Sequence, residues 1–444
     1  MKKVLLTLLA VFMAVPAFAI EVYNNGDNSV AIYGHIRGYL GYGMGANGKK
    51  NYMVDGTSQT GYPTDYSMSH NMLYGLQKNT RIGTNIKIGN FSGQIELGAN
   101  ERTMYNAKDQ QSDTVGFRQA WGAYTFGNGS KLLFGKTDTP TAMGGFNSDI
   151  YDTDGGLNGF GGTVTGSRRF QIQYSIAGLT LALIEDDMAD VNYKEIKDET
   201  GKVTGTTGIW GFNDNAPYTP RAAISYTLKN DNLLVKVAAT YTAVNGFYYK
   251  NAQGKVVEVP EQLGDKKNWT NLHAGGVTVG VKPTFGNMWV GFVARYGANE
   301  HLYGEAKTLA GNGTYDHLNI TKEYNLNPYL DKDGSFNNIH RVGAAVEFGM
   351  KATEKFTAII GAGYQATIPE LSKKPEFTSE SSVYHSYAVF LQGQYAFSPN
   401  FALVPQIAWY GGVLDSSSEQ AGVKDSESVT DGGLLVGAQF RVTF

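Results

Sequence analysis

The chain has 444 residues, among them 56 glycines, 28 tyrosines, 22 phenylalanines and 12 prolines, and it has no cysteine. Its formal net charge of -3 leaves no basic surplus, and this excludes a protein that binds nucleic acid through a basic surface. Glycines and aromatic residues suit turns and strands. No long stretch has the 3.6-residue periodicity of amphipathic helices, so a soluble protein with long helices is disfavoured.

The first segment has the pattern of an export signal. Lys2 and Lys3 precede the apolar run 4–15, and a small-x-small site follows at Ala17 to Ala19. The run is too short to span a bilayer as a helix, and no later stretch offers about 18 consecutive apolar residues. We therefore expect a signal peptide over residues 1–19, which is cleaved on export, and a single domain over residues 20–444.

The mature chain alternates between apolar and polar residues, most clearly in its last segment. There, one face carries Leu434, Val436, Ala438, Phe440, Val442 and Phe444, and the other carries Gly437, Gln439, Arg441 and Thr443. A half-buried strand in a soluble sandwich would show the same pattern. Its repetition along the chain, with single charges in mid-strand, favours a barrel with lipid outside and an aqueous lumen inside.

About sixteen such segments can be counted, and short turns alternate with long connections between them. The segments lie near residues 30–44, 80–88, 91–104, 115–126, 130–137, 168–175, 179–187, 219–229, 232–245, 271–283, 287–297, 338–350, 355–366, 381–397, 400–412 and 432–444. An even count lets the first and last strands pair and close the wall. The predicted fold class is all-β, a transmembrane antiparallel β-barrel.

Three short segments carry a family resemblance. They are the run IEVYNNGDN at 20–28 with IYG at 32–34, the run FRQAWGAY at 117–124 with FGK at 134–136, and the strand that ends in Phe444. They resemble the general diffusion porins, the trimeric sixteen-stranded outer-membrane channels of Gram-negative bacteria. The resemblance implies a homotrimer without cofactor or metal. It also implies a water-filled channel in each barrel for passive diffusion of small hydrophilic solutes and ions.

The resemblance further implies partners in the outer membrane and a device that narrows the pore. The barrel would lie among outer-membrane lipid and lipopolysaccharide, and Phe444 would be the signal read by the barrel assembly machinery. The third external loop would fold inward, and here it would be about residues 138–167. Its acidic residues are Asp149, Asp152 and Asp154. They are assigned by loop membership, because the Pro-Glu-Phe-Gly-Gly tip of enteric porins is missing.

The basic ladder that opposes this loop in the family maps by strand alignment onto His35, Arg81, Arg118 and Arg168. Arg37 shares the face of His35, where enteric porins have a lysine, and a histidine there makes the wall charge sensitive to pH. Spacing from Gly178 favours Arg168 as the pore residue, whereas strand parity with Gln171 and Gln173 favours Arg169. Acid on the loop and base on the wall would create a transverse field across the pore.

Other interpretations follow from the same residues. An outer-membrane enzyme is disfavoured because no Gly-x-Ser-x-Gly motif or cysteine occurs, and we predict no enzymatic activity. Six of the seven histidines are interpreted as solvated residues. Glu96 is expected to pair with neighbouring residues of the wall. The aromatic residues expected to form girdles at the membrane interfaces are Tyr33, Trp121, Trp289 and Trp409. A substrate-specific channel of eighteen strands, or an adhesin or structural barrel, remains an alternative.

Overall fold

The computed structural model describes residues 19–47, 67–77, 80–99, 115–148, 157, 159–161, 168–185, 194–197, 203–207, 209–212, 220–244, 247–250, 256–257, 272–300, 329–330, 336–369, 381–420 and 423–444. Within these ranges, no helix is long and apolar enough to cross a membrane.

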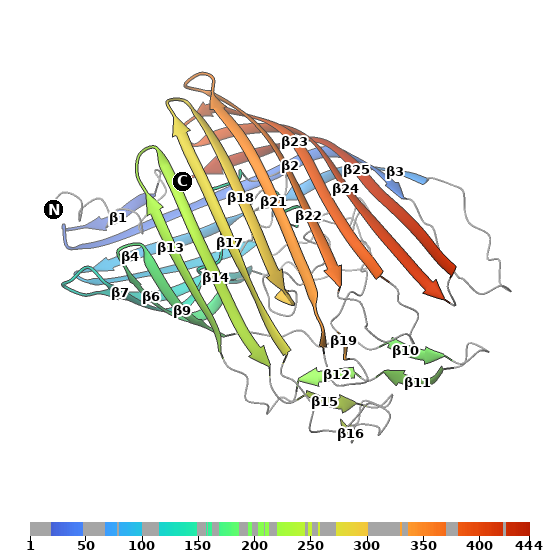
Figure 1. Cartoon of the computed structure of the whole chain (residues 1–444). Coiled ribbons are helices and arrows are strands. Elements are labelled where there is room, and N and C mark those ends of the chain that lie inside the picture. Colours follow the sequence, from blue (N-terminus) through green and yellow to red (C-terminus); the bar gives the residue numbers. More distant parts are fainter. Residues whose placement is uncertain are drawn as a thin grey trace.

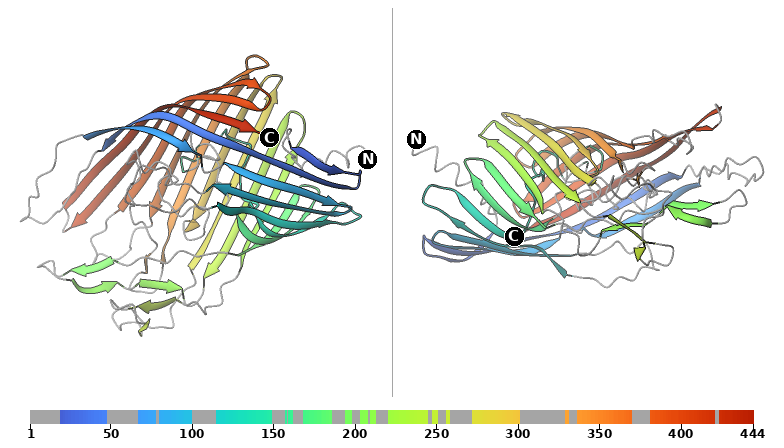
Figure 2. Two further views of the ribbon diagram at one scale, coloured as in Figure 1. Left: turned by 180° about the vertical axis from the view of Figure 1, so that it is seen from behind. Right: turned by 60° about the horizontal axis from the view of Figure 1, so that its bottom comes forward.

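The main element is a closed antiparallel β-barrel with sixteen positions in its wall (Figures 1 and 2). In order around the wall, the strands are β2 (Asn28–Asn47), β4 (Arg81–Ile88), β5 (Phe91–Ala99), β6 (Val115–Thr125), β7 (Lys131–Thr137), β8 (Arg169–Ile176), β9 (Leu179–Ile184), β13 (Arg221–Lys229), β14 (Leu233–Val244), β17 (Leu272–Phe285), β18 (Met288–Ala298), β21 (Ile339–Lys351), β22 (Phe356–Pro369), β23 (Ser381–Ser398), β24 (Phe401–Gln420) and β25 (Val423–Thr443). Every predicted segment corresponds to one of these strands.

The first and last wall strands close the barrel, as predicted. β2 pairs with β25 from His35 opposite Thr443 to Ala46 opposite Gly432. The backbone of Phe444 continues the ladder, because its N–H donates to Gly34 O at 3.0 Å and its carbonyl accepts from Gly34 N–H at 2.7 Å.

The sheet contains eighteen strands, but two of them add no position to the wall. β1 (Ile20–Asn24) pairs with the part of β2 that lies beyond the end of β25. β3 (Ser67–Leu76) and β4 pair with successive parts of β2 and occupy the same position. The eighteen-stranded alternative is therefore wrong. β3 was not predicted, because its residues lie between the predicted segments 30–44 and 80–88, where a long connection was expected.

The two faces of the wall follow the alternation of the sequence. In β21, Val342, Val346 and Phe348 are 44%, 46% and 42% exposed, whereas Arg341 and Glu347 on the opposite face are buried. The exposed side chains of the wall are apolar because they face outward, and the polar side chains point into the lumen, where they pair with one another.

Short strands lie beyond one end of the barrel, on the side of the long connections (Figure 1). β10 (Lys194–Lys197) pairs with β11 (Val203–Thr207), and β12 (Ile209–Phe212) pairs with β15 (Phe247–Lys250), which also pairs with β16 (Val256–Val257). β19 (Tyr329–Leu330) pairs with β20 (Phe336–Asn337).

Candidate channel lumen

We call the connection between β7 and β8 (residues 138–167) the crossing loop. Its described residues, 138–148, 157 and 159–161, make contacts with the lumen face of the wall. Its first anchor contains Met143 and Phe146, which pack with Ala238 and Val293. Two lysines of the wall hold the loop backbone: Lys236 Nζ donates to Ala142 O at 2.6 Å, and Lys282 Nζ donates to Gly145 O at 2.8 Å.

A carboxylate of the wall extends this first anchor. Glu347, fully buried on β21, accepts hydrogen bonds from the Ser148 backbone N–H at 2.5 Å and from the Ser148 hydroxyl at 2.9 Å. Trp289 Nε1 donates to the same carboxylate at 3.1 Å. Hydrogen bonds to a charged group of this kind are the stronger ones in proteins, so Glu347 fixes this point of the loop firmly.

The second anchor lies further round the wall. Leu157 and Phe160 are buried in a cluster that includes Tyr410 and Phe390, and the rings of Phe160 and Tyr410 are 5.4 Å apart. The Ser386 hydroxyl on β23 donates to Gly159 O at 2.7 Å. The two anchors therefore lie on the wall from β14 to β24, and the cluster of the second anchor continues to Leu435 on β25 and Tyr39 on β2.

Glycines on the lumen face make room for the loop backbone. A Cβ atom at Gly291 would lie 2.0 Å from Phe146 O, and one at Gly363 would lie 2.1 Å from Phe160 O. Glycine is thus required where the two backbones approach closely. Gly291 and Gly363 were not among the predicted site residues. Their signal was glycine at lumen-parity positions of neighbouring strands, together with large apolar residues inside a polar loop.

The predicted basic residues of the wall lie on the other arc, and three charges form a compact group there. Glu96 on β5 is buried, and its carboxylate lies 3.2 Å from Arg81 Nε and 2.9 Å from Arg118 Nε. Tyr33 OH donates to the same carboxylate at 2.9 Å. We call Arg81, Glu96 and Arg118 the charge triad. The predicted pairing of Glu96 with its neighbours is confirmed.

A β-bulge aims Arg118 into the lumen. The register between β5 and β6 shifts between Glu96 and Leu97, so that Gln119 lies opposite Glu96 and Phe117 lies opposite Leu97. Phe117 is 59% exposed on the outer face, whereas Arg118 and Gln119 both face inward. Bulges commonly redirect a side chain in this way. Without the bulge, strict alternation would turn Arg118 outward.

Three further basic residues continue this arc next to the charge triad. His35 and Arg37 are buried on the lumen face of β2, and Arg37 Nη1 donates to Gln77 Oε1 at 3.4 Å. Arg441 on β25 lies opposite Arg37 in the ladder and donates to Gln439. We call His35, Arg37, Arg81, Arg118 and Arg441 the basic arc. Arg441 was not among the predicted pore residues, although its lumen parity was visible in the terminal strand.

The structure separates the roles of Arg168 and Arg169. Arg169 is the first residue of β8 and shares the inward face of Gln171 and Gln173. Arg168 precedes the strand, and its Nε lies 3.3 Å from Asp138 Oδ1 at the base of the crossing loop. The inward face of Arg169 therefore agrees with the criterion of strand parity and not with the spacing from Gly178. Arg168 instead forms an ion pair with Asp138 of the crossing loop.

The three acidic residues expected at the constriction, Asp149, Asp152 and Asp154 (the loop aspartates), lie outside the described residues. Their neighbours Ser148 and Leu157 are both anchored to the wall. The segment that carries the loop aspartates thus starts and ends at points held inside the barrel.

The aromatic residues correct one expectation. Tyr33, Trp121 and Trp289 face the lumen, where their polar atoms donate to Glu96, Gln94 and Glu347 respectively. They are therefore not girdle residues. Trp409 is 44% exposed on the outer face, where a girdle residue would lie. Buried Tyr and Trp side chains usually find such partners. The lumen parity of Tyr33 was already visible in the sequence, because Tyr33 lies two residues before His35.

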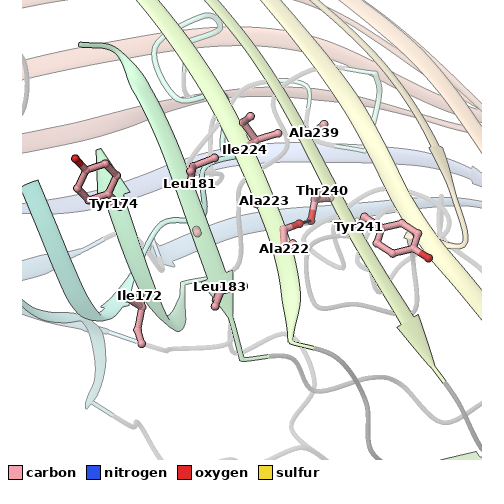
Figure 3. Close-up of a pocket in the computed structure, with 11 residues that line it drawn as sticks. Ile172, Tyr174, Leu181, Leu183, Ala222, Ala223, Ile224, Ala239, Thr240 and Tyr241 are labelled. Atoms are coloured by element: carbon pink, nitrogen blue, oxygen red, sulfur yellow. Dashed lines mark hydrogen bonds between the residues drawn. The ribbon is translucent and has the colours of Figure 1, made fainter. Parts of the chain in front are cut away.

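A groove of about 550 Å³ lies on the outer face of the wall and is separate from the lumen. Figure 3 shows its lining side chains on neighbouring strands. Ala222 and Ala239 leave a hollow between the larger Leu181, Ile224 and Tyr241, and the lining is almost entirely apolar. Such a surface suits contact with apolar chains, so it is no candidate for a polar solute.

Within the described ranges, no cluster of His, Asp or Glu side chains could hold a metal ion.

Comparison with known proteins places the fold. No protein-family model matches the chain, and no curated protein matches it by sequence. The outer membrane channel DcaP of Acinetobacter baumannii superposes with a TM-score of 0.53 at 15% sequence identity, over 95% of this chain and 99% of that chain. OmpT, an outer membrane protein of Vibrio cholerae, gives a TM-score of 0.47 at 12% identity, over 96% of this chain and 99% of that chain. The likeness to DcaP shows the fold of an outer-membrane β-barrel.

Proposed function

We propose that this protein is an outer-membrane porin, a water-filled channel for passive diffusion of small hydrophilic solutes and ions, without enzymatic activity. The observation that carries the proposal is the crossing loop, whose two anchors are held on the inside of the barrel wall. A sixteen-stranded barrel is too wide for wall side chains alone to fill. A loop fixed inside it narrows the passage to a selective gap.

Fixed charges would select the solutes. The basic arc supplies positive charge on one side, and the loop aspartates would supply negative charge on the other. A field across a narrow, water-filled section orients dipolar solutes and disfavours apolar ones, while water and small ions pass. Arg169 would extend the basic side toward the base of the loop.

The assembled form would be a homotrimer in the outer membrane, surrounded by lipid and lipopolysaccharide. Cleavage of residues 1–19 would precede insertion by the barrel assembly machinery, with Phe444 as its recognition element. Support for the trimer comes from the porin-like segments 20–28 and 117–124.

Single-channel recording in planar bilayers tests the proposal. The purified folded protein should insert as events of three equal conductance steps, and a salt gradient should produce a reversal potential that gives the sign of ion selectivity. Light scattering in mild detergent should give the mass of three chains. Insertion without any conductance would refute the channel, and a single step with a monomer mass would refute the trimer alone.

A further inference from the structure

The chain turns back toward the wall directly after the end of β18. Asn299 has a φ of 54°, in the left-handed region that asparagine tolerates better than most residues with a side chain. Its side chain holds the turn between β17 and β21, the two strands that flank β18. Asn299 Nδ2 donates to His273 O at 2.8 Å, and the Ile339 N–H donates to Asn299 Oδ1 at 2.9 Å. This turn fixes the backbone from which the next side chain, that of Glu300, extends.

Glu300 meets two arginines on the lumen face of the wall. Arg295 Nη2 donates to Glu300 Oε2, and Arg341 Nη1 lies 3.8 Å from the same oxygen. Tyr296 and Val342, which follow the two arginines in sequence, are 51% and 44% exposed on the outer face. The arginines therefore point inward, and the Glu300 carboxylate lies inside the barrel with them. We call Arg295, Glu300 and Arg341 the mouth triad.

Two glycines of the lumen face make room for the Glu300 side chain. A Cβ atom at Gly276 would lie 2.8 Å from Glu300 Oε1, and one at Gly297 would overlap the carboxylate. Gly297 lies opposite Gly276 on one side and opposite Arg341 on the other. The wall is thus shaped to hold a carboxylate at this point, and all three members of the mouth triad are buried there.

The mouth triad lies next to the crossing loop, on the side of the long connections. On β21, Gly343 meets the crossing loop, because its Cβ would lie 2.7 Å from Gly161 Cα, and Arg341 is the next inward position toward the long connection. On β18, Val293 belongs to the first anchor, and Arg295 is the next inward position in the same direction. Two residues along a strand span about 7 Å. An ion that moves between the loop-side mouth and the crossing loop therefore passes the mouth triad.

We propose that the mouth triad is a second charge-selective section of the channel, in series with the constriction, and that Glu300 limits its preference for anions. The inference rests on the proposed function and adds a part of the lumen that contains no residue of the basic arc. Positive charge on Arg295 and Arg341 attracts anions and repels cations near the mouth. The Glu300 carboxylate opposes both effects, so its removal should increase the preference for anions.

The reversal potential of the folded full-length protein in planar bilayers, measured across a potassium chloride gradient, tests the proposal. For an ion path about 10 Å from the carboxylate at about 0.1 M salt, Glu300→Gln should raise the anion-to-cation permeability ratio by about 1.7-fold. Arg341→Gln should lower the ratio by about the same factor. The double variant keeps the wild-type net charge and should return the ratio to the wild-type value.

Two controls separate the effect of the charge from a change in structure. Glu300→Asp keeps the negative charge on a shorter side chain and should keep the ratio near that of the wild type. At about 1 M salt the screening length falls to about 3 Å, so the shift caused by Glu300→Gln should nearly disappear. A variant that changed the width of the passage would instead alter the conductance at every salt concentration. Migration of unboiled and boiled samples shows that each variant is folded.

The proposal is overturned if folded Glu300→Gln keeps the wild-type permeability ratio at about 0.1 M salt, or if its shift is undiminished at about 1 M salt. If Glu96→Gln in the charge triad changes the ratio and Glu300→Gln does not, the mouth triad is refuted and the proposed channel stands. A wild-type protein that does not conduct would overturn the proposed function and this inference together.

Discussion

Replacing Glu96 by glutamine is the sharpest test of the charges on the basic arc. The Glu96 carboxylate lies between the guanidinium groups of Arg81 and Arg118, at 3.2 and 2.9 Å, so two positive charges and one negative charge are held together. Glutamine removes the negative charge at nearly unchanged side-chain volume and still offers a carbonyl oxygen to Tyr33. The net positive charge of the charge triad therefore doubles without opening a cavity.

The size of the effect follows from Coulomb's law. A monovalent ion that passes about 7 Å from the added charge interacts with it by about 0.6 kcal/mol in water, and by about 0.3 kcal/mol after screening at about 0.1 M salt. Because 1.4 kcal/mol corresponds to a factor of ten, anion occupancy should rise and cation occupancy should fall by about 1.7-fold each. The anion-to-cation permeability ratio should thus rise by about threefold.

The assay is the reversal potential of the reconstituted protein across a planar bilayer with a potassium chloride gradient. Arg118→Gln should change the permeability ratio by about the same factor in the opposite direction. The double variant Glu96→Gln with Arg118→Gln restores the wild-type net charge and should restore the wild-type ratio. If Glu96→Gln leaves the ratio unchanged, or if the double variant does not return toward the wild type, the charge triad does not act on permeant ions.

Other perturbations address the loop and the closure of the barrel. Replacing the loop aspartates together by asparagine should shift the reversal potential toward anions, and an unchanged potential would place the constriction elsewhere. Gly291→Ala puts a methyl group 2.0 Å from Phe146 O, so the loop must move off the wall by roughly 1.3 Å to reach an ordinary carbon–oxygen contact, and single-channel conductance should fall. Gly116→Ala, where a Cβ has no neighbour within 4 Å, should leave it unchanged. Deleting Phe444 removes both hydrogen bonds to Gly34, and the yield of folded protein in the outer membrane should drop; normal yield would contradict a role in closure.

The sixteen wall strands could be predicted because their signal is local. Alternation with period two indicates which side chains face lipid and which face water, and it can be read from neighbouring residues alone. In β21, the sequence pattern already separated Val342, Val346 and Phe348 from Arg341 and Glu347. The pairing of the first strand with the last followed from the even count.

The pairing partners inside the lumen could not be predicted in the same way. The crossing loop docks on β14 to β24 through contacts such as Ser148 with Glu347 and Ser386 with Gly159, which join residues far apart in the chain. No periodicity links such residues, because their proximity depends on how the barrel closes and on which face each strand presents. The register shift at Glu96 shows the same limit, since one inserted residue decides that Arg118 points inward.

The sequence by itself determined the class of fold, the number of wall strands, the loop that would cross the lumen and most of the basic residues on the lumen wall. Tertiary structure decided what those residues do. It made Glu96 the common partner of Arg81 and Arg118, set Arg168 apart from Arg169, and paired three tyrosines with three histidines on neighbouring strands. The physical reason is that strand formation depends on neighbouring residues, whereas these contacts depend on the stagger between strands, which only the closed barrel fixes.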